Sequence, residues 1–142
     1  MPKTPNALLR LRKHADYQRV YASSRKQHAK QMSFFYSLRP LEGPDGKSRR
    51  SDTEGPRIGL TVGKVLGMAV ERNRIKRRMR EIIRRHAGVL AFPVDVILHP
   101  RRTVLELEHA KLDREVAQIF RQIQNALEKQ ALVAKKSEGP QA

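Results

Sequence analysis

The sequence predicts one α/β (α+β) domain, a two-layer sandwich with helices on one face of a mixed central sheet. Two observations predict this class. Segments with helical spacing of apolar residues and segments with strand-like alternation follow one another in the order helix, strand, strand, helix, strand, helix. The chain has 142 residues, of which 39% are hydrophobic and 31% charged. That size and composition suit a single modest core beneath a large charged surface.

The N-terminal half opens with residues 1–9, which we expect to form a flexible basic arm because two prolines interrupt them. HADYQRVYASS then places Tyr17, Val20 and Tyr21 at i, i+3 and i+4, which predicts a short helix with both tyrosines on one side. QMSFFYSL alternates as a half-buried strand does, except that Phe35 is aromatic on the polar side.

The middle of the chain contains a predicted insertion and a predicted strand. Residues 41–56 are rich in Gly, Pro, Ser and Asp and lack periodicity, so we expect a flexible insertion. RIGLTV, residues 57–62, alternates as a second strand. The pattern then predicts a helix from Ala69 to His86, with Gly88 as its stop.

The C-terminal half supplies a third strand and a last helix. The third strand covers Val94–Leu98 and ends at Pro100, and apolar residues from Leu112 to Leu127 recur at the spacing of a long amphipathic helix. We expect residues 10–130 to form the domain and 131–142 a disordered tail. Another short strand has room near 41–56 or around 103–107.

The charge indicates the class of partner. The formal net charge is +16, and it comes from residues 1–40 and 57–102, whereas residues 103–142 are balanced. Such a field favours polyanions, and nucleic acid is the leading candidate. The chain lacks Trp, a membrane-spanning apolar run and the hydrophobic run of a signal peptide, so we expect a cytoplasmic protein without a membrane partner.

Catalysis by the protein itself is not indicated. The absence of Cys excludes thiol nucleophiles and thiolate-bound zinc, and the five His residues show no metal-binding spacing. We therefore expect no catalytic residue, no protein-bound metal and no small-molecule substrate.

The segment from Arg72 to Arg85 carries the strongest functional signal. On a helical wheel its apolar residues and His86 fall within a sector of roughly 100°, and cations fill the rest: Arg74, Lys76, Arg77, Arg78, Arg80, Arg84 and Arg85. A solvated helix face is the alternative. However, such a face normally mixes charges at i, i+4, and here arginine outnumbers lysine seven to one, which favours phosphate clamps.

Five further residues have two interpretations each. Arg72 lies near the apolar stripe, where a charge is costly unless it points into a groove at the helix start. Asn73 can bind a base or ribose, or make a local backbone hydrogen bond. Tyr17, Tyr21 and Phe35 can stack on single-stranded nucleotides, and the alternative is core packing. The two interpretations are equal for the tyrosines, whereas Phe35 favours the surface role.

The stretch RIGLTVGKVLGMAVERNRIKRRMREIIR, residues 57–84, resembles the signature of the bacterial ribonuclease P protein component, whose hallmark is an RNR core followed by a basic helix. Residues 10–21 and 31–38 resemble the first helix and first strand of that family. The resemblance implies a fold with a left-handed βαβ crossover. It also implies a holoenzyme that removes the 5′ leader of precursor tRNA, with the catalytic centre and its magnesium ions in the RNA subunit.

The resemblance also implies two sets of contacts. Contacts to the catalytic RNA are implied for Lys64, Arg72, Asn73, Arg74, Lys76, Arg77 and Arg80. Contacts to the leader of precursor tRNA are implied for Tyr17, Tyr21 and Phe35. The chain departs from the family pattern at Val65, where a second cation is usual, at Gly63, and in the length of the 41–56 insertion.

Two other classes of function stay open at this point. A structural RNA-binding protein of the ribosome or another ribonucleoprotein, or a DNA-architectural protein, is also small and basic, but it needs no aromatic platform. A protein nuclease needs clustered carboxylates or His, and Asp16, Glu71, Glu81 and Asp95 show no such arrangement.

Overall fold

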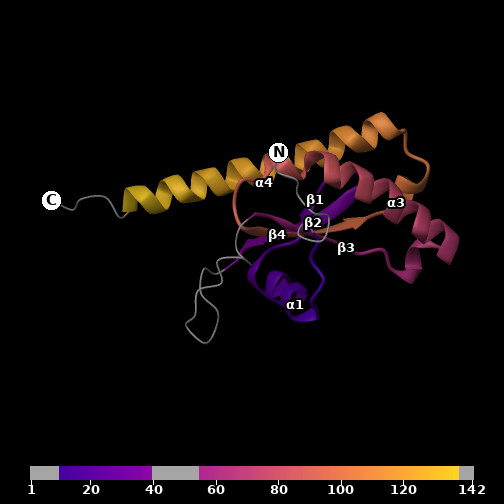
Figure 1. Ribbon diagram of the computed structural model, residues 1–142, viewed down its shortest axis with the longest axis horizontal. Helices are drawn as coiled ribbons and strands as arrows, with labels where there is room; N and C mark the ends of the chain where they lie inside the picture. Colours follow the sequence, from indigo (N-terminus) through magenta and orange to yellow (C-terminus); the bar gives the residue numbers. More distant parts are fainter. Residues whose placement is uncertain (1–9, 40–54, 138–142) are drawn as a thin grey trace, which may run out of the picture.

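The computed structural model describes residues 10–39 and 55–137, which form three α-helices and a four-stranded sheet (Figure 1). The α-helices are α1 (His14–Ser23), α3 (Ala69–His86) and α4 (His109–Ser137). The strands are β1 (Gln27–His28), β2 (Met32–Leu38), β3 (Arg57–Leu60) and β4 (Val94–Pro100). Short 3₁₀ turns are η2 (Lys64–Leu66), η3 (Ala87–Val89) and η4 (Arg102–Leu105).

The sheet is mixed, as predicted. Its strand order is β1-β2-β4-β3, and β2 pairs antiparallel with both β1 and β4. The strands β3 and β4 are parallel neighbours, and the connection between them contains α3. This connection is the βαβ crossover of the predicted fold. Its left-handedness stays a prediction.

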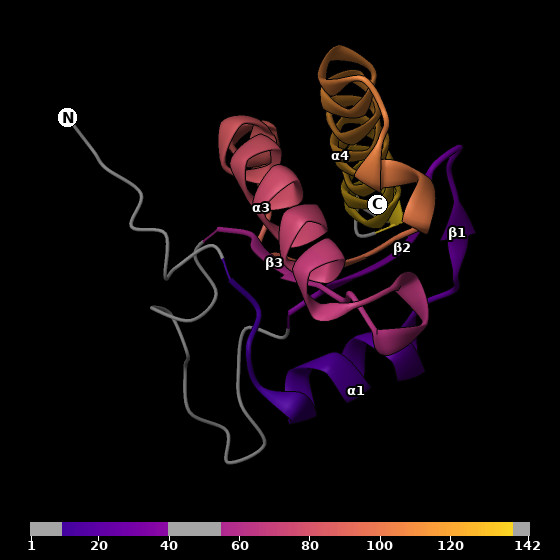
Figure 2. The ribbon, with the colours of Figure 1, turned by 90° about the vertical axis from the view of Figure 1, so that its right-hand side faces the viewer.

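The helices cover both faces of the sheet. Figures 1 and 2 show α3 and α4 side by side on one face and α1 on the other. Along β4, Val94, Val96 and Leu98 join the main core with α3 and α4, whereas Ile97 packs with Val20 of α1. The predicted fold class is confirmed, but its placement of the helices on one face needs correction for α1. The physical reason is that Phe35 and Ile97 give the second face an apolar surface of its own.

The main core contains the two predicted helical stripes. Its buried residues from α3 are Ile75, Met79, Ile82 and Ile83, and those from α4 are Leu112, Val116, Ile119, Phe120, Ile123 and Leu127. His86, the remaining member of the α3 stripe, is partly buried and forms a 2.8 Å hydrogen bond through Nε2 to the Asp113 carboxylate. Both predicted amphipathic patterns are therefore confirmed.

Two predictions about element positions were wrong. Among the described residues the additional strand is β1, whose two polar residues carry no apolar alternation, and not a strand at 103–107; most of the alternative position, 41–56, lies outside the described residues. Residues 102–105 form the turn η4 instead. The final helix continues to Ser137, so residues 131–137 are not a disordered tail. They contain no Gly or Pro, and good helix formers continue a helix without tertiary packing.

Some predictions fall outside the described residues. These are the basic arm at 1–9, most of the 41–56 insertion and the last five residues. At the end of the insertion, Gly55 has a positive φ of 102°, and its carbonyl accepts a 2.5 Å hydrogen bond from the Arg39 guanidinium.

Candidate nucleic-acid interface

The start of α3 is held by a turn and a carboxylate. Gly67 has a φ of 136°, a conformation that glycine adopts without strain. The next residue, Met68, donates its backbone N–H to the Glu71 carboxylate at 3.0 Å. Arg102 also binds Glu71, at 3.0 Å, and these contacts hold the pKa of Glu71 below its usual range. The helix start is therefore a fixed platform for the basic residues that follow.

Arg72 turns back towards this platform. Its Nε donates a 3.1 Å hydrogen bond to the Gly67 carbonyl oxygen, and the side chain is partly buried. The residue therefore lies against the turn at the helix start. This hydrogen bond keeps its charge from being left without a partner beside the apolar stripe. Asn73, beside it, is exposed, and its side chain makes no hydrogen bond to another described residue.

Two groups of cations on α3 differ in their partners. Arg78 donates to the backbone carbonyls of Val104 at 2.6 Å, Leu105 at 2.9 Å and Leu107. Arg85 pairs with the Asp113 carboxylate at 3.0 Å. These two arginines therefore contribute to the structure, by holding the η4 segment and α4 against α3.

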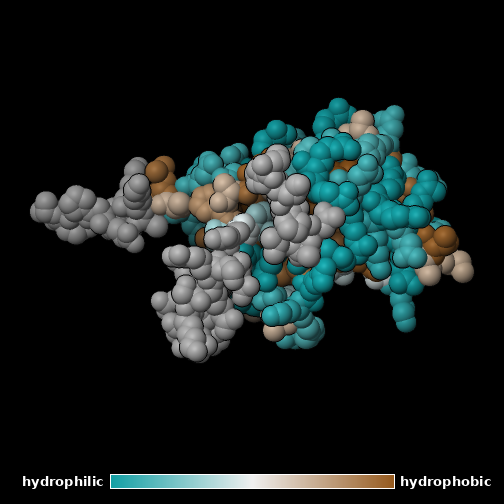
Figure 3. Space-filling view, viewed as in Figure 1, coloured by the Kyte–Doolittle hydropathy of each residue, from teal (hydrophilic) through white to brown (hydrophobic). Residues whose placement is uncertain are grey.

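The second group consists of the exposed or half-buried cations predicted to bind RNA on this helix: Arg74, Lys76, Arg77 and Arg80. Within residues 10–39 and 55–137, none of them forms an ion pair or a side-chain hydrogen bond. Figure 3 shows hydrophilic residues over most of the surface around α3. Like charges one turn apart repel, so an external anion that neutralised them would stabilise this face.

Lys64 lies in η2, close in sequence to an apolar patch. Lys64 is exposed, and so are three hydrophobic residues nearby, Val65 at 91%, Met68 at 74% and Val70 at 71%. Val65 stands where the family usually has a second cation, and it is the most exposed of these three hydrophobic side chains.

The aromatic residues predicted to stack on RNA lie together, although they come from separate elements. Tyr21 of α1 contacts Phe35 of β2 edge to face, with ring centroids 4.9 Å apart, and Tyr17 lies 6.4 Å from Tyr21. His99 of β4 completes the group, because its Nε2 is 3.0 Å from the Tyr21 hydroxyl. We call these four residues the aromatic cluster. The signal for His99 was present in the sequence, since alternation along β4 places it on the face of Ile97.

The members of the cluster differ in how firmly they are held. Tyr17 donates its hydroxyl to the Leu11 carbonyl at 3.2 Å, and a Cβ at Gly59 would lie 2.5 Å from that hydroxyl oxygen. Burial, with a smaller contribution from Tyr21, raises the pKa of Tyr17. Tyr21 is more open, at 37% exposed. Tyr17 therefore both packs and lines the surface, whereas Tyr21 presents more of its ring to solvent.

His99 is a neutral member of the cluster near physiological pH. Burial lowers the pKa of His99, and the nearby charge of Lys26 lowers it further. A neutral imidazole can accept the Tyr21 hydroxyl proton in a hydrogen bond. The cluster therefore offers rings without a charge of its own.

A hollow of about 430 Å³ connects the two predicted contact regions. Tyr17 lines it from α1 and Lys76 lines it from α3. The other lining residues come from the segment before α1 and from the end of β3: Arg12, His14, Leu60, Thr61, Val62 and Gly63. A chain of single-stranded nucleic acid that crosses this hollow would meet the Tyr17 ring on the α1 side and Lys76 on the α3 side.

Asp95 fixes α1 to the sheet. Its carboxylate is fully buried and binds three arginines, Arg39 at 2.6 Å, Arg57 at 2.8 Å and Arg19 of α1. Burial lowers the pKa of Arg39, and the contact with Asp95 opposes that shift. Sequence reasoning considered Asp95 only as a nuclease carboxylate and did not predict this cluster, because its arginines are far apart in the chain.

The described part of the chain offers neither a membrane span nor a metal site. No helix there is long and apolar enough to cross a membrane. Nor do three or more His, Asp or Glu side chains of those residues gather where they could hold a metal ion.

Comparisons with known proteins give the family. A family model described as Ribonuclease P matches residues 6–124. The ribonuclease P protein component of Brucella suis is 33% identical over 117 residues, which cover 81% of this chain and 79% of the relative. The same component of Desulforapulum autotrophicum is 33% identical over 122 residues, which cover 86% and 91%.

Solved structures agree with these matches. The ribonuclease P protein of Staphylococcus aureus is 28% identical with a TM-score of 0.56, and the alignment covers 89% of this chain and 95% of that one. The ribonuclease P protein of Thermotoga maritima is similar in fold, with a TM-score of 0.62 at 20% identity, over 80% of this chain and 96% of that one.

Proposed function

Because the chain belongs to the ribonuclease P protein family, we propose that it is the protein subunit of ribonuclease P, an endoribonuclease holoenzyme that removes the 5′ leader of precursor tRNA. In this proposal the protein binds the ribonuclease P RNA and the leader. The observation that supports it best is the hollow lined by both Tyr17 and Lys76, since one strand of RNA can then touch the aromatic cluster and the basic helix together.

The catalytic RNA is assigned to the basic side of this hollow. The proposed contacts are Lys64, Arg72, Asn73, Arg74, Lys76, Arg77 and Arg80. Guanidinium groups bind phosphate with two parallel hydrogen bonds, and Arg74, Lys76, Arg77 and Arg80 of α3 have no partner among the described residues that would compete. Affinity for the RNA should therefore fall as the salt concentration rises, because each phosphate contact releases counterions.

The leader is assigned to the aromatic side. Tyr17, Tyr21 and Phe35 are proposed to stack on its unpaired bases, each base contributing about 1 to 3 kcal/mol. Stacking tolerates any base, since every base has a flat apolar face. Such a site therefore suits leaders of unrelated sequence.

Hydrolysis itself is assigned to the RNA subunit with its magnesium ions. The described residues of the protein do not fit a metal ion held by protein alone, because their carboxylates are dispersed. Two of them have structural partners already, Glu71 with Arg102 and Asp95 with three arginines. The protein's part is to bind and orient RNA.

The test is reconstitution from the purified full chain, transcribed ribonuclease P RNA and precursor tRNA. We expect leader removal to require the RNA, and the protein to tighten binding of precursor tRNA more than of mature tRNA. Cleavage by the protein with no RNA added would contradict the proposal. So would equal effects on the two tRNAs, which would fit a general structural RNA-binding protein.

A further inference from the structure

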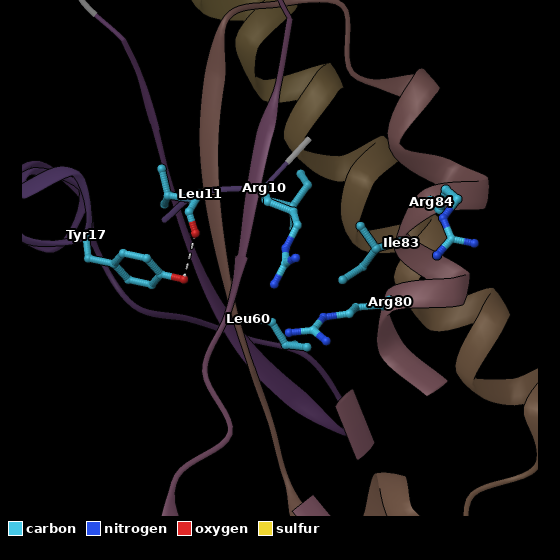
Figure 4. A pocket seen from close by; sticks show the side chains of 8 residues that line it. Arg10, Leu11, Tyr17, Leu60, Arg80, Ile83 and Arg84 are labelled. Atoms are coloured by element: carbon cyan, nitrogen blue, oxygen red, sulfur yellow. Dashed lines mark hydrogen bonds between the residues drawn. The ribbon is translucent and has the colours of Figure 1, made fainter. Parts of the chain in front are cut away.

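A second hollow lies between the edge strand β3 and α3, and Tyr17 lines it too. It has a volume of about 170 Å³ and is lined by the N-terminal segment, β3 and α3. Figure 4 shows Arg10 and Arg80 extending into the space between β3 and α3, with Ile83 and Arg84 on the helix side. We call this hollow the edge pocket.

The floor of the edge pocket is apolar. Leu11, Ile58 and Ile83 are at most 8% exposed, and Leu60 and Tyr17 are partly buried. A cavity of about 150 Å³ lined by such residues accepts a benzene ring. The edge pocket is therefore large enough for a single six-membered ring, which is the size of a pyrimidine base.

The rim of the edge pocket is cationic. It carries Arg10, Arg80 and Arg84, and no acidic residue lines the pocket. Among the described residues, these three side chains have no ion pair or side-chain hydrogen bond. Guanidinium groups bind phosphate and also stack on base rings. An apolar floor with an arginine rim therefore matches a nucleotide better than it matches a free phosphate or an apolar molecule.

The backbone geometry keeps the pocket in place. Strand β3 is an edge strand, and at Ile58 its outer side meets the N-terminal segment through the Arg10–Ile58 bridge and the 3.0 Å hydrogen bond from Leu11 N–H to the Ile58 carbonyl. Arg80 and Arg84 lie one turn apart on α3 and are fixed by the buried Ile83 between them. All three arginines are thus carried by ordered backbone.

We propose that the edge pocket binds one unpaired pyrimidine nucleotide of RNA, with its base on the apolar floor and its phosphate at Arg10, Arg80 and Arg84. This inference rests on the proposed function, because it adds a nucleotide site that shares Tyr17 and Arg80 with the contacts already assigned. The nucleotide comes either from the catalytic RNA or from the leader, and the chemistry at the pocket is the same.

Binding to the free protein is measured by methyl NMR of the full chain with uridine monophosphate as the probe. We expect the methyl signals of Leu11, Leu60 and Ile83 to shift with uridine monophosphate and to stay unchanged with inorganic phosphate. Equal shifts with inorganic phosphate, or shifts at other methyl groups only, would overturn the proposal.

The variant for this test is R10Q/R84Q, and its matched control is R114Q/R121Q. Both doubles remove two exposed arginines, and the control removes them from α4. We expect R10Q/R84Q to abolish the methyl shifts and the control to keep them. In the holoenzyme, R10Q/R84Q should reduce the slope of log K against log salt by about 0.7 for each phosphate that the protein no longer binds. An equal reduction in the control would make the effect one of net charge, and the pocket assignment would fail.

The source of the nucleotide is settled by crosslinking in the holoenzyme. One sample carries 4-thiouridine in the catalytic RNA and another carries it in the leader. A crosslink to peptides containing residues 10–11 or 58–60, which the proposed function does not otherwise assign to RNA, supports the proposal and names the source. Leader removal without any such crosslink would overturn the pocket while leaving the proposed function intact. If the methyl signals shift but the protein does not assist leader removal, the pocket binds a nucleotide and the proposed function is wrong.

Discussion

The two faces of the sheet are built from the same strands but have different contents. Towards α3 and α4 lies a continuous apolar core, to which β4 contributes Val94, Val96 and Leu98. Towards α1, the alternate residues of β4 meet a small apolar cluster, the buried charges around Asp95 and the aromatic cluster. The large core contains most of the buried apolar residues, so the face under α1 can carry the buried charges and the aromatic cluster that we propose binds the leader.

Replacement of a large core residue should give the greatest loss of stability. Phe120 is fully buried on α4. We expect Phe120→Ala to lower the free energy of unfolding by about 3 to 5 kcal/mol, measured in urea. Leu132→Ala on the same helix is the control, since Leu132 is 57% exposed, and its effect should stay within about 0.5 kcal/mol. Similar losses in the two variants would mean that α4 is not anchored by this core.

Removal of the buried charge should come next. Asp95→Asn removes the carboxylate that three arginines share, although Arg57 keeps an ion pair with Asp16 at 3.5 Å, and breaking a buried pair costs about 3 to 5 kcal/mol. We expect the lower end, about 3 kcal/mol, because Arg19 and Arg57 still reach solvent at 29% and 22% exposure. Leader binding should weaken as well, since α1 carries Tyr17 and Tyr21. A variant with unchanged stability would show that the apolar contacts alone hold α1.

Changes in the aromatic cluster should affect binding more than folding. We expect Tyr21→Ala to weaken affinity for precursor tRNA by about 1 to 3 kcal/mol, with a smaller loss for mature tRNA. Tyr21→Phe keeps the ring and removes only the hydrogen bond to His99, so it should bind nearly as well as the native protein. Equal losses for precursor and mature tRNA would contradict the leader assignment. Tyr17→Ala should act similarly on binding but also destabilise the fold.

Two neighbouring arginines of α3 should respond differently. Arg77→Ala should reduce the slope of log K against log salt for catalytic RNA by about 0.7 to 0.9, with little change in stability. Arg78→Ala should lower stability instead, because three backbone carbonyls lose their donor. If both variants changed the slope equally, the division between structural and RNA-facing arginines would be wrong.

Acidification should produce the smallest effect, confined to the face under α1. The pKa of His99 is lower in the folded protein than its ordinary value of 6.5. The unfolded chain therefore takes up this proton first, and the corresponding stability is lost as pH falls through about 6.5 towards the folded pKa. We expect the native protein to lose more stability between pH 7.5 and 5.5 than the His99→Gln variant. Equal losses would show that His99 does not contribute.

Much of the fold followed from local patterns. The helix from about Ala69 to His86 and the apolar residues of its stripe were predicted correctly, because 18 residues with one apolar face leave little ambiguity. The strand β1 could not be predicted, since its two polar residues form a strand only by pairing with β2. The position of α1 was missed for a similar reason, because its partners, Phe35 and Ile97, lie on two other elements.

The residue types of the candidate site could be predicted from the sequence. Which of these residues hold the fold together and which face solvent could not. Arg77 and Arg78 are equivalent on a charge count, and only the carbonyls of residues 104–107 distinguish them. Asp95 and its three arginines span residues 19–95, so no local pattern reveals them. His99 is different: it was not named as a site residue from the sequence, but alternation along β4 is enough to place it on the face of Ile97.

The contact between Tyr17 and Gly59 constrains how this protein can vary. The tyrosine ring occupies the space that any side chain at position 59 would need. Loss of the ring would leave room for a larger residue in β3, whereas enlargement at position 59 would expel the ring. Positions 17 and 59 are therefore coupled by this contact, so that a side chain added at Gly59 would also change where Tyr17 lies in the aromatic cluster.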